Sequence, residues 1–196
     1  MATIFSSAQH PAEFMYQGKW GVMHHFLADF YQAENPEKWN KLVDEFDVKG
    51  LANQLDSVHA GWVIFTIGQN SGYYCSPNSV YDKAMNFPQS HCSQRDLIAD
   101  LADALNEKGI PLMAYIPFGF KDSHAPKNYW YADMVREYSM RWGDKIKGWW
   151  IDGYYGSVEN IPLMTEAILS GNSNAALAFN PGLGIIDRTC EFENYT

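Results

Sequence analysis

A single carboxylate follows the most aromatic apolar run in the sequence. Residues 145–156 read KIKGWWIDGYYG, so that two tryptophans and an isoleucine directly precede Asp152. A carboxylate at the end of a buried strand costs free energy unless it is hydrated, hydrogen-bonded or used in a reaction. Two interpretations of Asp152 are therefore open: it caps the turn that follows the strand, or it does chemistry.

Neutral polar and aromatic side chains stand at the ends of the other apolar runs. With Asp152, the residues at these positions are His24, His25, Gln69, Asn70, Tyr115, Trp150 and Asn180. One carboxylate among amides, an imidazole and aromatic rings is suited to cleaving a sugar. Neutral polar groups bind hydroxyls, a ring packs on the apolar face of a pyranose, and the carboxylate attacks the anomeric carbon or stabilises its positive charge.

Other common chemistries lack their residue patterns in this chain. No His and carboxylate stand at zinc-protease spacing, and the adjacent His24 and His25 point to opposite sides of a strand. No Ser or Cys occupies a nucleophile elbow, and no phosphate-binding loop is present. The cysteines, Cys75, Cys92 and Cys190, have no C-x-x-C spacing and are expected to be reduced structural thiols. We therefore expect neither a metal nor another cofactor.

The composition indicates a folded globular domain. Of the 196 residues, 46% are hydrophobic and 19% are charged. The net charge of -9, without any run of Lys or Arg longer than a pair, argues against a nucleic acid or an anionic membrane as the partner. No stretch is long and apolar enough to cross a membrane, and no leader-like segment opens the chain. As it stands the chain is expected to be cytoplasmic, or secreted or periplasmic if its N-terminus has been trimmed.

The elements that would position these residues alternate between short apolar strands and amphipathic helices. The third helix is expected at 127–142 and the fourth at 162–170. Asp47 is the expected cap of the first helix, and Ser93, three residues before Asp96, the expected start of the second. The expected strands are residues 19–25, 62–67, 111–116, 147–152 and 175–179.

Continuous apolar strands between helices indicate a parallel sheet covered on both faces. A dinucleotide-binding unit would carry a glycine-rich turn after its first strand, and this chain has none there. The long loops after the first two strands instead stand where a (β/α)8 barrel builds its active site. The expected fold is α/β, an incomplete (β/α)8 TIM-like barrel of about five parallel strands with alternating helices. Because a complete barrel needs about 250 residues, residues 1–196 are expected to form a single catalytic-barrel domain that is truncated at its C-terminus.

Four segments, in this order, resemble the retaining alpha-L-fucosidase family. They are WGVMHH, LANQLDSVHAGWVIFTIGQNSGY, SQRDLIADLADALNEKGIPLMAYI and GWWIDG, which together span most of the chain. The resemblance implies a (β/α)8-like catalytic barrel and a double-displacement hydrolysis in which Asp152 is the nucleophile. It also implies that His25, Tyr115 and Trp150 contact the sugar, and that the partner is a carbohydrate, either a fucoside or a related glycoside.

The sequence departs from the family where the sugar is held. The family has two adjacent histidines after its second strand, and this chain has Gln69 and Asn70, whose amides can still bind sugar hydroxyls. The acid/base of the family is a glutamate placed after the fifth strand or later, so the resemblance implies Glu191, Glu193 or a glutamate beyond Thr196 for this role. Arg188 matches an arginine of the same loop.

Two functions other than hydrolysis remain open from the sequence. A degenerate barrel could bind carbohydrate without cleaving it, as the replacement of both histidines would favour. The 196 residues could also be an inactive fragment, because part of a barrel leaves an unpaired strand edge.

Overall fold

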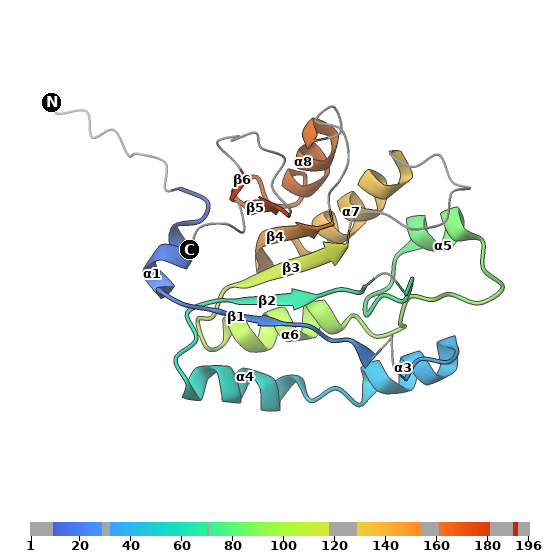
Figure 1. The fold of residues 1–196 in the computed structure, drawn as a ribbon, viewed down its shortest axis with the longest axis horizontal. Helices are drawn as coiled ribbons and strands as arrows, with labels where there is room; N and C mark the ends of the chain where they lie inside the picture. The colour runs from blue at the N-terminus through green and yellow to red at the C-terminus, as the bar shows by residue number, and fades with distance from the viewer. Residues whose placement is uncertain are drawn as a thin grey trace, which may run out of the picture.

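The computed structural model describes residues 10–28, 32–69, 71–117, 129–153, 161–180 and 190–191. Its strands form one sheet in chain order, and each strand is parallel to the next (Figure 1). The strands are β1 (Val22–His24), β2 (Val63–Thr66), β3 (Leu112–Pro117), β4 (Ile146–Asp152), β5 (Ala176–Phe179) and β6 (Cys190–Glu191). This is the strand order of a (β/α)8 barrel, so the expected fold is confirmed, and β6 adds a short strand to the five expected.

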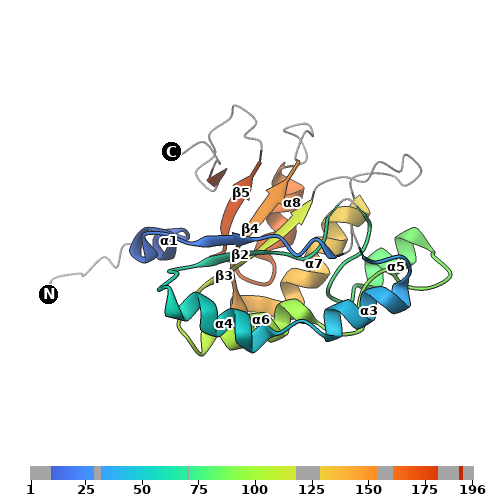
Figure 2. The same cartoon turned by 60° about the horizontal axis from the view of Figure 1, so that its bottom comes forward.

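Helices follow the strands and cover the outer face of the sheet. Figure 2 shows α4 and α6 running side by side beneath the strands. The four helices that the sequence predicted are α4 (Val48–Ser57), α6 (Leu97–Asn106), α7 (Tyr129–Trp142) and α8 (Ile161–Leu169). The main core lies between this layer and the outward positions of the sheet, such as Phe65, Ala114 and Trp149. Every residue of β2 and β3 is buried, which explains why these strands read as continuous apolar runs.

The inner face of the sheet carries a second, smaller apolar cluster. Ile64, Met113 and Tyr115 are buried there, and the partly buried Trp150 packs against them. Two side chains of α1 (Glu13–Gly18) join this cluster from the end at which the strands begin (Figure 1). Successive residues of a strand point to opposite faces, so these inward positions lead along β3 and β4 toward the strand ends.

A close backbone contact holds α1 against the sheet. A Cβ added at Gly61 would lie 2.2 Å from the carbonyl oxygen of Gly18, which no side chain tolerates. Two glycines therefore let the end of α1 approach the start of β2.

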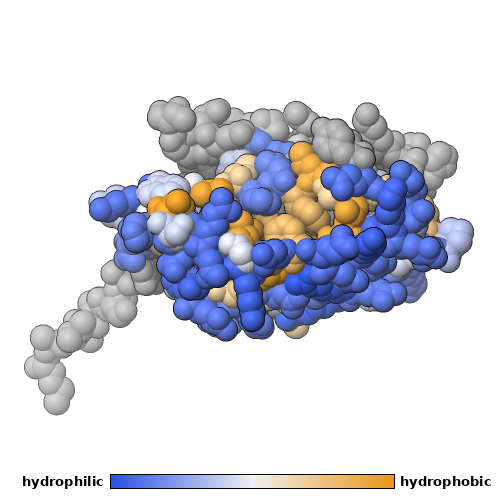
Figure 3. All heavy atoms as spheres, turned by 90° about the horizontal axis from the view of Figure 1, so that it is seen from below, coloured by the Kyte–Doolittle hydropathy of each residue, from blue (hydrophilic) through white to orange (hydrophobic). Residues whose placement is uncertain are grey.

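The sheet ends at β1, and the outward edge of this strand is unpaired within the described residues. Figure 3, seen from below Figure 1, shows apolar side chains gathered near the middle of the face that carries α3, α4 and β1. Met23 of β1 is 39% exposed, and Val22, Phe26 and Leu42 are only partly buried. An edge of this kind is a natural place for another strand to pair.

Two helices lie in segments that the sequence predicted as loops. They are α3 (Pro36–Asp44) and α5 (Ser79–Met85). Asn35 caps α3 by accepting from the backbone N–H of Lys38, and Asn78 caps α5 by accepting from that of Tyr81. These asparagine caps are the local sequence signal that marks the start of the two helices.

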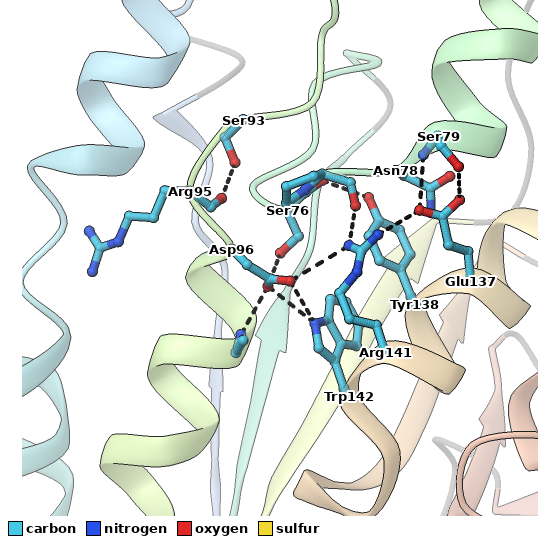
Figure 4. Close-up of polar contacts among 12 residues, drawn as sticks. Ser76, Asn78, Ser79, Ser93, Arg95, Asp96, Glu137, Tyr138, Arg141 and Trp142 are labelled. Atoms are coloured by element: carbon cyan, nitrogen blue, oxygen red, sulfur yellow. Dashed lines mark hydrogen bonds and ion pairs between the residues drawn. The ribbon is translucent and has the colours of Figure 1, made fainter.

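The start of α6 differs from the prediction. Its N-cap is Asp96, which accepts from the backbone N–H of Ala99, and not Ser93. Ser93 instead donates its hydroxyl to the carbonyl oxygen of Arg95 (Figure 4). The expected cap of α4 is confirmed, since Asp47 accepts from the backbone N–H of Gly50.

Asp96 also joins three segments that are distant in the sequence (Figure 4). Its carboxylate accepts from the hydroxyl of Ser76 at 2.9 Å and from the indole Nε1 of Trp142 at 3.1 Å. The guanidinium of Arg141 lies 3.6 Å from the same carboxylate. The loop after β2, the start of α6 and the end of α7 therefore meet at one side chain.

Glu137 of α7 caps α5 from outside that helix (Figure 4). Its carboxylate accepts from the backbone N–H groups of Ser79 and Val80 and from the hydroxyl of Ser79. Burial is the largest single effect and raises the pKa of Glu137, but these hydrogen bonds and the charge of Arg141 outweigh it and lower the pKa overall.

We expect Glu137→Gln to lower stability at neutral pH and to lose that effect in acid. A carboxyl whose pKa is lowered in the folded state contributes stability above its unfolded pKa, and this contribution is lost as the pH falls through the folded pKa. The measurement is the free energy of unfolding in urea between about pH 6 and about pH 3. Glu166→Gln is the matched control because Glu166, also on an outer helix, is 71% exposed. An equal difference from wild type at every pH would contradict the assignment.

Candidate active site

Asp152 ends β4 with its carboxylate held by two neighbouring strands. The hydroxyl of Tyr115 on β3 donates to Oδ2 at 2.5 Å, and Nδ2 of Asn180, just after β5, donates to Oδ1 at 2.7 Å. Trp150 and Asp152 are two residues apart on β4, so both belong to the inner face. The described hydrogen bonds of this carboxylate thus come from side chains at the strand ends. Gly153 follows Asp152 in a turn, and residues 154–160 lie outside the described residues.

A second chain of contacts reaches Tyr115 from β1 and β2. Nε2 of Gln69 donates to the hydroxyl oxygen of Tyr115 at 2.8 Å and lies 3.4 Å from Nδ1 of His25. The rings of His25 and Tyr115 meet edge to face, with centroids 5.1 Å apart. The ends of β1 to β5 therefore bring His25, Gln69, Tyr115, Asp152 and Asn180 together.

The two adjacent histidines face different environments, as their spacing predicted. His25 is exposed at the strand ends. His24 stacks on the ring of Phe65 at 5.1 Å, on the side of the main core. Burial, and secondarily the neighbouring His25, lower the pKa of His24. Neutral imidazole is therefore the favoured form of His24.

Trp150 lies between the site and the inner cluster. It is half-buried and pairs in register with Tyr115 on one side and Ala178 on the other. Its ring belongs to the cluster of Ile64, Met113 and Tyr115. Trp150 therefore lies on the same face of β4 as Asp152, two residues before it and next to the inner cluster.

The remaining predicted residues are described in part or not at all. Glu191 pairs with Ala178, so its backbone occupies the same row of the sheet as Tyr115 and Trp150. Three predicted site residues, Asn70, Arg188 and Glu193, lie outside the described residues.

Asn180 is the site residue whose role the sequence did not reveal. It counted among the polar residues that follow a strand, but nothing in its neighbourhood indicated a bond to a carboxylate 28 residues earlier. Its backbone N–H donates to the carbonyl of Ile151, which continues the β4–β5 pairing beyond β5. That continued pairing sets the amide of Asn180 beside Asp152.

The chemistry of the site is that of a carboxylate among neutral donors. Asp152 accepts from a phenol and an amide, and an imidazole and a second amide lie within the same network. Among the described residues no three His, Cys, Asp or Glu side chains come together as metal ligands do. Cys75 and Cys92 are buried and form no disulfide, and burial is the main cause that raises the pKa of Cys92 to about 12. Neither described thiol is therefore suited to act as a nucleophile.

Comparisons at the level of sequence yield no relative. No protein-family model matches the chain, and no curated protein matches it. In the described part of the chain, no helix has the length and apolar character needed to cross a membrane.

Solved structures of the same fold do match. The alpha-L-fucosidase AlfC from Lactobacillus casei, solved with alpha-L-fucose product, is 14% identical with a TM-score of 0.65, over 86% of this chain and 70% of that one. A bacterial fucosidase with a monovalent iminocyclitol inhibitor is 18% identical with a TM-score of 0.61, over 90% of this chain and 50% of that one.

Endo-fucoidan hydrolases also match. MfFcnA4, from glycoside hydrolase family 107, is 15% identical with a TM-score of 0.66, over 89% of this chain and 34% of that one. The chain spans about a third to a half of the length of the endo-fucoidan hydrolases that it matches. The resemblance found in the sequence is thereby confirmed for the architecture: this chain has the fold shared by these fucose-acting glycoside hydrolases.

Proposed function

We propose that the protein is a glycoside hydrolase that cleaves alpha-L-fucosides or closely related glycosides with retention of anomeric configuration. The observation that carries this proposal is the placement of Asp152. Its carboxylate stands at the strand ends, where such barrels hold their active sites, and donors from both flanking strands fix its orientation. An oriented carboxylate beside neutral hydroxyl-binding groups matches the needs of glycosyl transfer.

In the proposed mechanism Asp152 attacks the anomeric carbon while a glutamic acid protonates the leaving oxygen. The same glutamate then deprotonates the water that releases the sugar. Glu191 and Glu193 are the proposed candidates, and the strand row that Glu191 shares with Trp150 supports the first. In a retaining enzyme the two carboxyl groups stand about 5 to 5.5 Å apart.

The other predicted residues would bind the sugar. His25, Gln69 and Asn70 would bind hydroxyls, Trp150 would pack on the ring, and Tyr115 would line the pocket beside Asp152. Arg188 would supply a cation to the site, as the resemblance in sequence implies. The names of the matching structures, which include fucosidases and endo-fucoidan hydrolases, support a fucose-containing carbohydrate as the substrate.

We also propose that residues 1–196 form a single domain, the N-terminal part of a longer barrel. Eight strands close such a barrel, and the described strands leave β1 as an open edge with apolar side chains around it. The function should therefore be tested in the full protein that contains these residues.

The test is hydrolysis of an aryl alpha-L-fucoside followed by ¹H NMR of the first sugar released. We expect turnover, with the alpha anomer appearing before mutarotation mixes the two forms. The beta anomer as first product would contradict the retaining mechanism. If the full protein neither cleaves the fucoside nor binds the sugar, the proposal is wrong.

A second candidate function is binding of the same sugars without cleavage. The described network favours it in one respect, because both oxygens of Asp152 are already hydrogen-bonded and Gln69 is engaged with Tyr115. Calorimetric binding of fucosides without turnover would support this second function.

A further inference from the structure

The hydrogen bonds of the site follow one donor-to-acceptor order, in which the amide of Gln69 is the first donor. An ionised carboxylate only accepts hydrogen bonds, so the single hydroxyl hydrogen of Tyr115 must point to Oδ2 of Asp152. The oxygen of Tyr115 is then left to accept, and Nε2 of Gln69 supplies the donor at 2.8 Å. The order is therefore Gln69 to Tyr115 to Asp152.

The same amide nitrogen constrains the imidazole of His25. Nε2 of Gln69 carries two hydrogens and lies 3.4 Å from Nδ1 of His25. Because an amide nitrogen cannot accept, Nδ1 must be the unprotonated nitrogen of the ring. A neutral imidazole then carries its hydrogen on Nε2.

The reversed orientation of the amide breaks the network. With its oxygen toward Tyr115, Gln69 would take the hydroxyl hydrogen for itself and leave Oδ2 of Asp152 without this donor. The backbone of Gln69 is also held in place. Its carbonyl accepts from the N–H of Gly72, and a Cβ added at the preceding Gly68 would lie 2.3 Å from the carbonyl oxygen of Tyr73.

We propose that Gln69 is a positioning residue that holds Tyr115 and His25 in the hydrogen-bonding states found in the site. Its amide donates to the oxygen of Tyr115 while Tyr115 donates to Asp152, and it keeps His25 in its Nε2–H tautomer. The site consequently offers a sugar hydroxyl an N–H donor at His25 and a carboxylate whose Oδ2 is already oriented. That last step rests on the proposed function, whereas the tautomer and the direction of the bonds do not.

The inference is tested by the ¹⁵N chemical shifts of the histidine rings, which distinguish the two tautomers. The spectra are recorded on the full protein labelled with ¹⁵N-histidine, about two pH units above the ordinary imidazole pKa. His25→Gln identifies the signals of His25. In the wild-type protein we expect His25 to be entirely in the Nε2–H form.

Two substitutions of Gln69 should change the tautomer of His25 in different ways. Gln69→Glu replaces the donor by acceptors, so His25 should change to the Nδ1–H form and donate to the new carboxylate. Gln69→Met removes both donor and acceptor at similar length, so the two tautomers should mix as they do in the side chain of free histidine. His24, which stacks on Phe65 in the main core, is the internal control and should keep its shifts in both variants.

The outcomes separate this inference from the proposed function. A wild-type His25 in the Nδ1–H form, or the same tautomer ratio in all three proteins, would overturn the inference whether or not the protein cleaves fucosides. If the tautomer changes as expected and no fucoside is cleaved, the inference stands and the hydrolase proposal fails. If the tautomer changes as expected and the protein cleaves fucosides, Gln69→Glu should lower kcat on an aryl fucoside about 10- to 100-fold, as expected for the loss of one partly buried hydrogen-bond donor to Tyr115.

Discussion

Replacement of Asp152 by alanine is expected to lower kcat/KM on an aryl alpha-L-fucoside by about four to six orders of magnitude. The variant lacks the atom that would bond to the anomeric carbon, and no other described carboxylate is hydrogen-bonded to Tyr115 and Asn180. The measurement is steady-state hydrolysis by the full protein, with the free energy of unfolding in urea measured in parallel.

Two further variants separate a chemical role of Asp152 from a structural one. Asp152→Asn keeps the size of the side chain and still accepts from Tyr115, so it should fold normally and remain as inactive as the alanine variant. Asp144→Asn is the matched control, because Asp144 is an exposed aspartate in the 3-10 turn before β4. It should leave the rate unchanged.

Added azide distinguishes a nucleophilic role of Asp152 from a structural one, because azide can replace only a missing nucleophile. In Asp152→Ala a small anion fits the space of the missing carboxylate and can attack the anomeric carbon in its place. We expect the rate to rise with azide concentration and a glycosyl azide of inverted configuration to form. A full rate in Asp152→Asn would remove Asp152 from the mechanism.

The order of strands and outer helices was predictable from the sequence because each strand is a local apolar run. Segments such as PLMAYI and WVIFTI are buried on both faces in the structure, and this double burial is what makes their apolar character continuous. The helices α4 and α6 each bury a stripe of residues at three- and four-residue steps, which is also a local pattern.

The elements that the sequence did not reveal depend on distant contacts. Helix α3 buries Trp39, whose indole Nε1 donates to the carbonyl oxygen of Tyr74, 35 residues away. Ser93 satisfied the local pattern of a cap, but Asp96 gains in addition the bonds from Ser76 and Trp142. These tertiary bonds favour Asp96 over Ser93 and move the start of the helix.

The sequence predicted which residues meet in the site, but it did not predict which of them form hydrogen bonds with one another. Positions after the strands identified His25, Gln69, Tyr115 and Asp152 as neighbours, because parallel strands end at one edge. The bond from Asn180 to Asp152 depends on the register of β4 and β5, which fixes which residues stand side by side. A single sequence carries no direct signal of that register.

The second large effect is expected for Asp96→Ala, which should destabilise the fold by about 3 kcal/mol or more. The substitution removes the N-cap of α6, which alone is worth about 1 kcal/mol. It also leaves the indole N–H of Trp142 and the hydroxyl of Ser76 without their bonds to this carboxylate. The guanidinium of Arg141 loses one of its two nearby carboxylates and keeps Glu137. Each buried donor that loses its partner costs about 1 to 3 kcal/mol.

Asp47→Ala is the matched control for this prediction. Asp47 caps α4 with the same bond to the backbone N–H three residues later, but it is exposed and joins no other segment through a described side-chain bond. It should cost about 1 kcal/mol. The measurement is urea unfolding of the three proteins under identical conditions.

A double-mutant cycle with Trp142→Phe then isolates the contact across helices. The phenyl ring keeps the packing and lacks the N–H, so Asp96→Ala should cost less in this background than in wild type by about 1 kcal/mol. If Asp96→Ala costs no more than Asp47→Ala, or if the cycle shows no coupling, Asp96 is a local cap only. The junction between α6 and α7, whose following strands β3 and β4 carry Tyr115 and Asp152, would then be held mainly by apolar packing, beside the exposed pair of Lys145 and Asp103.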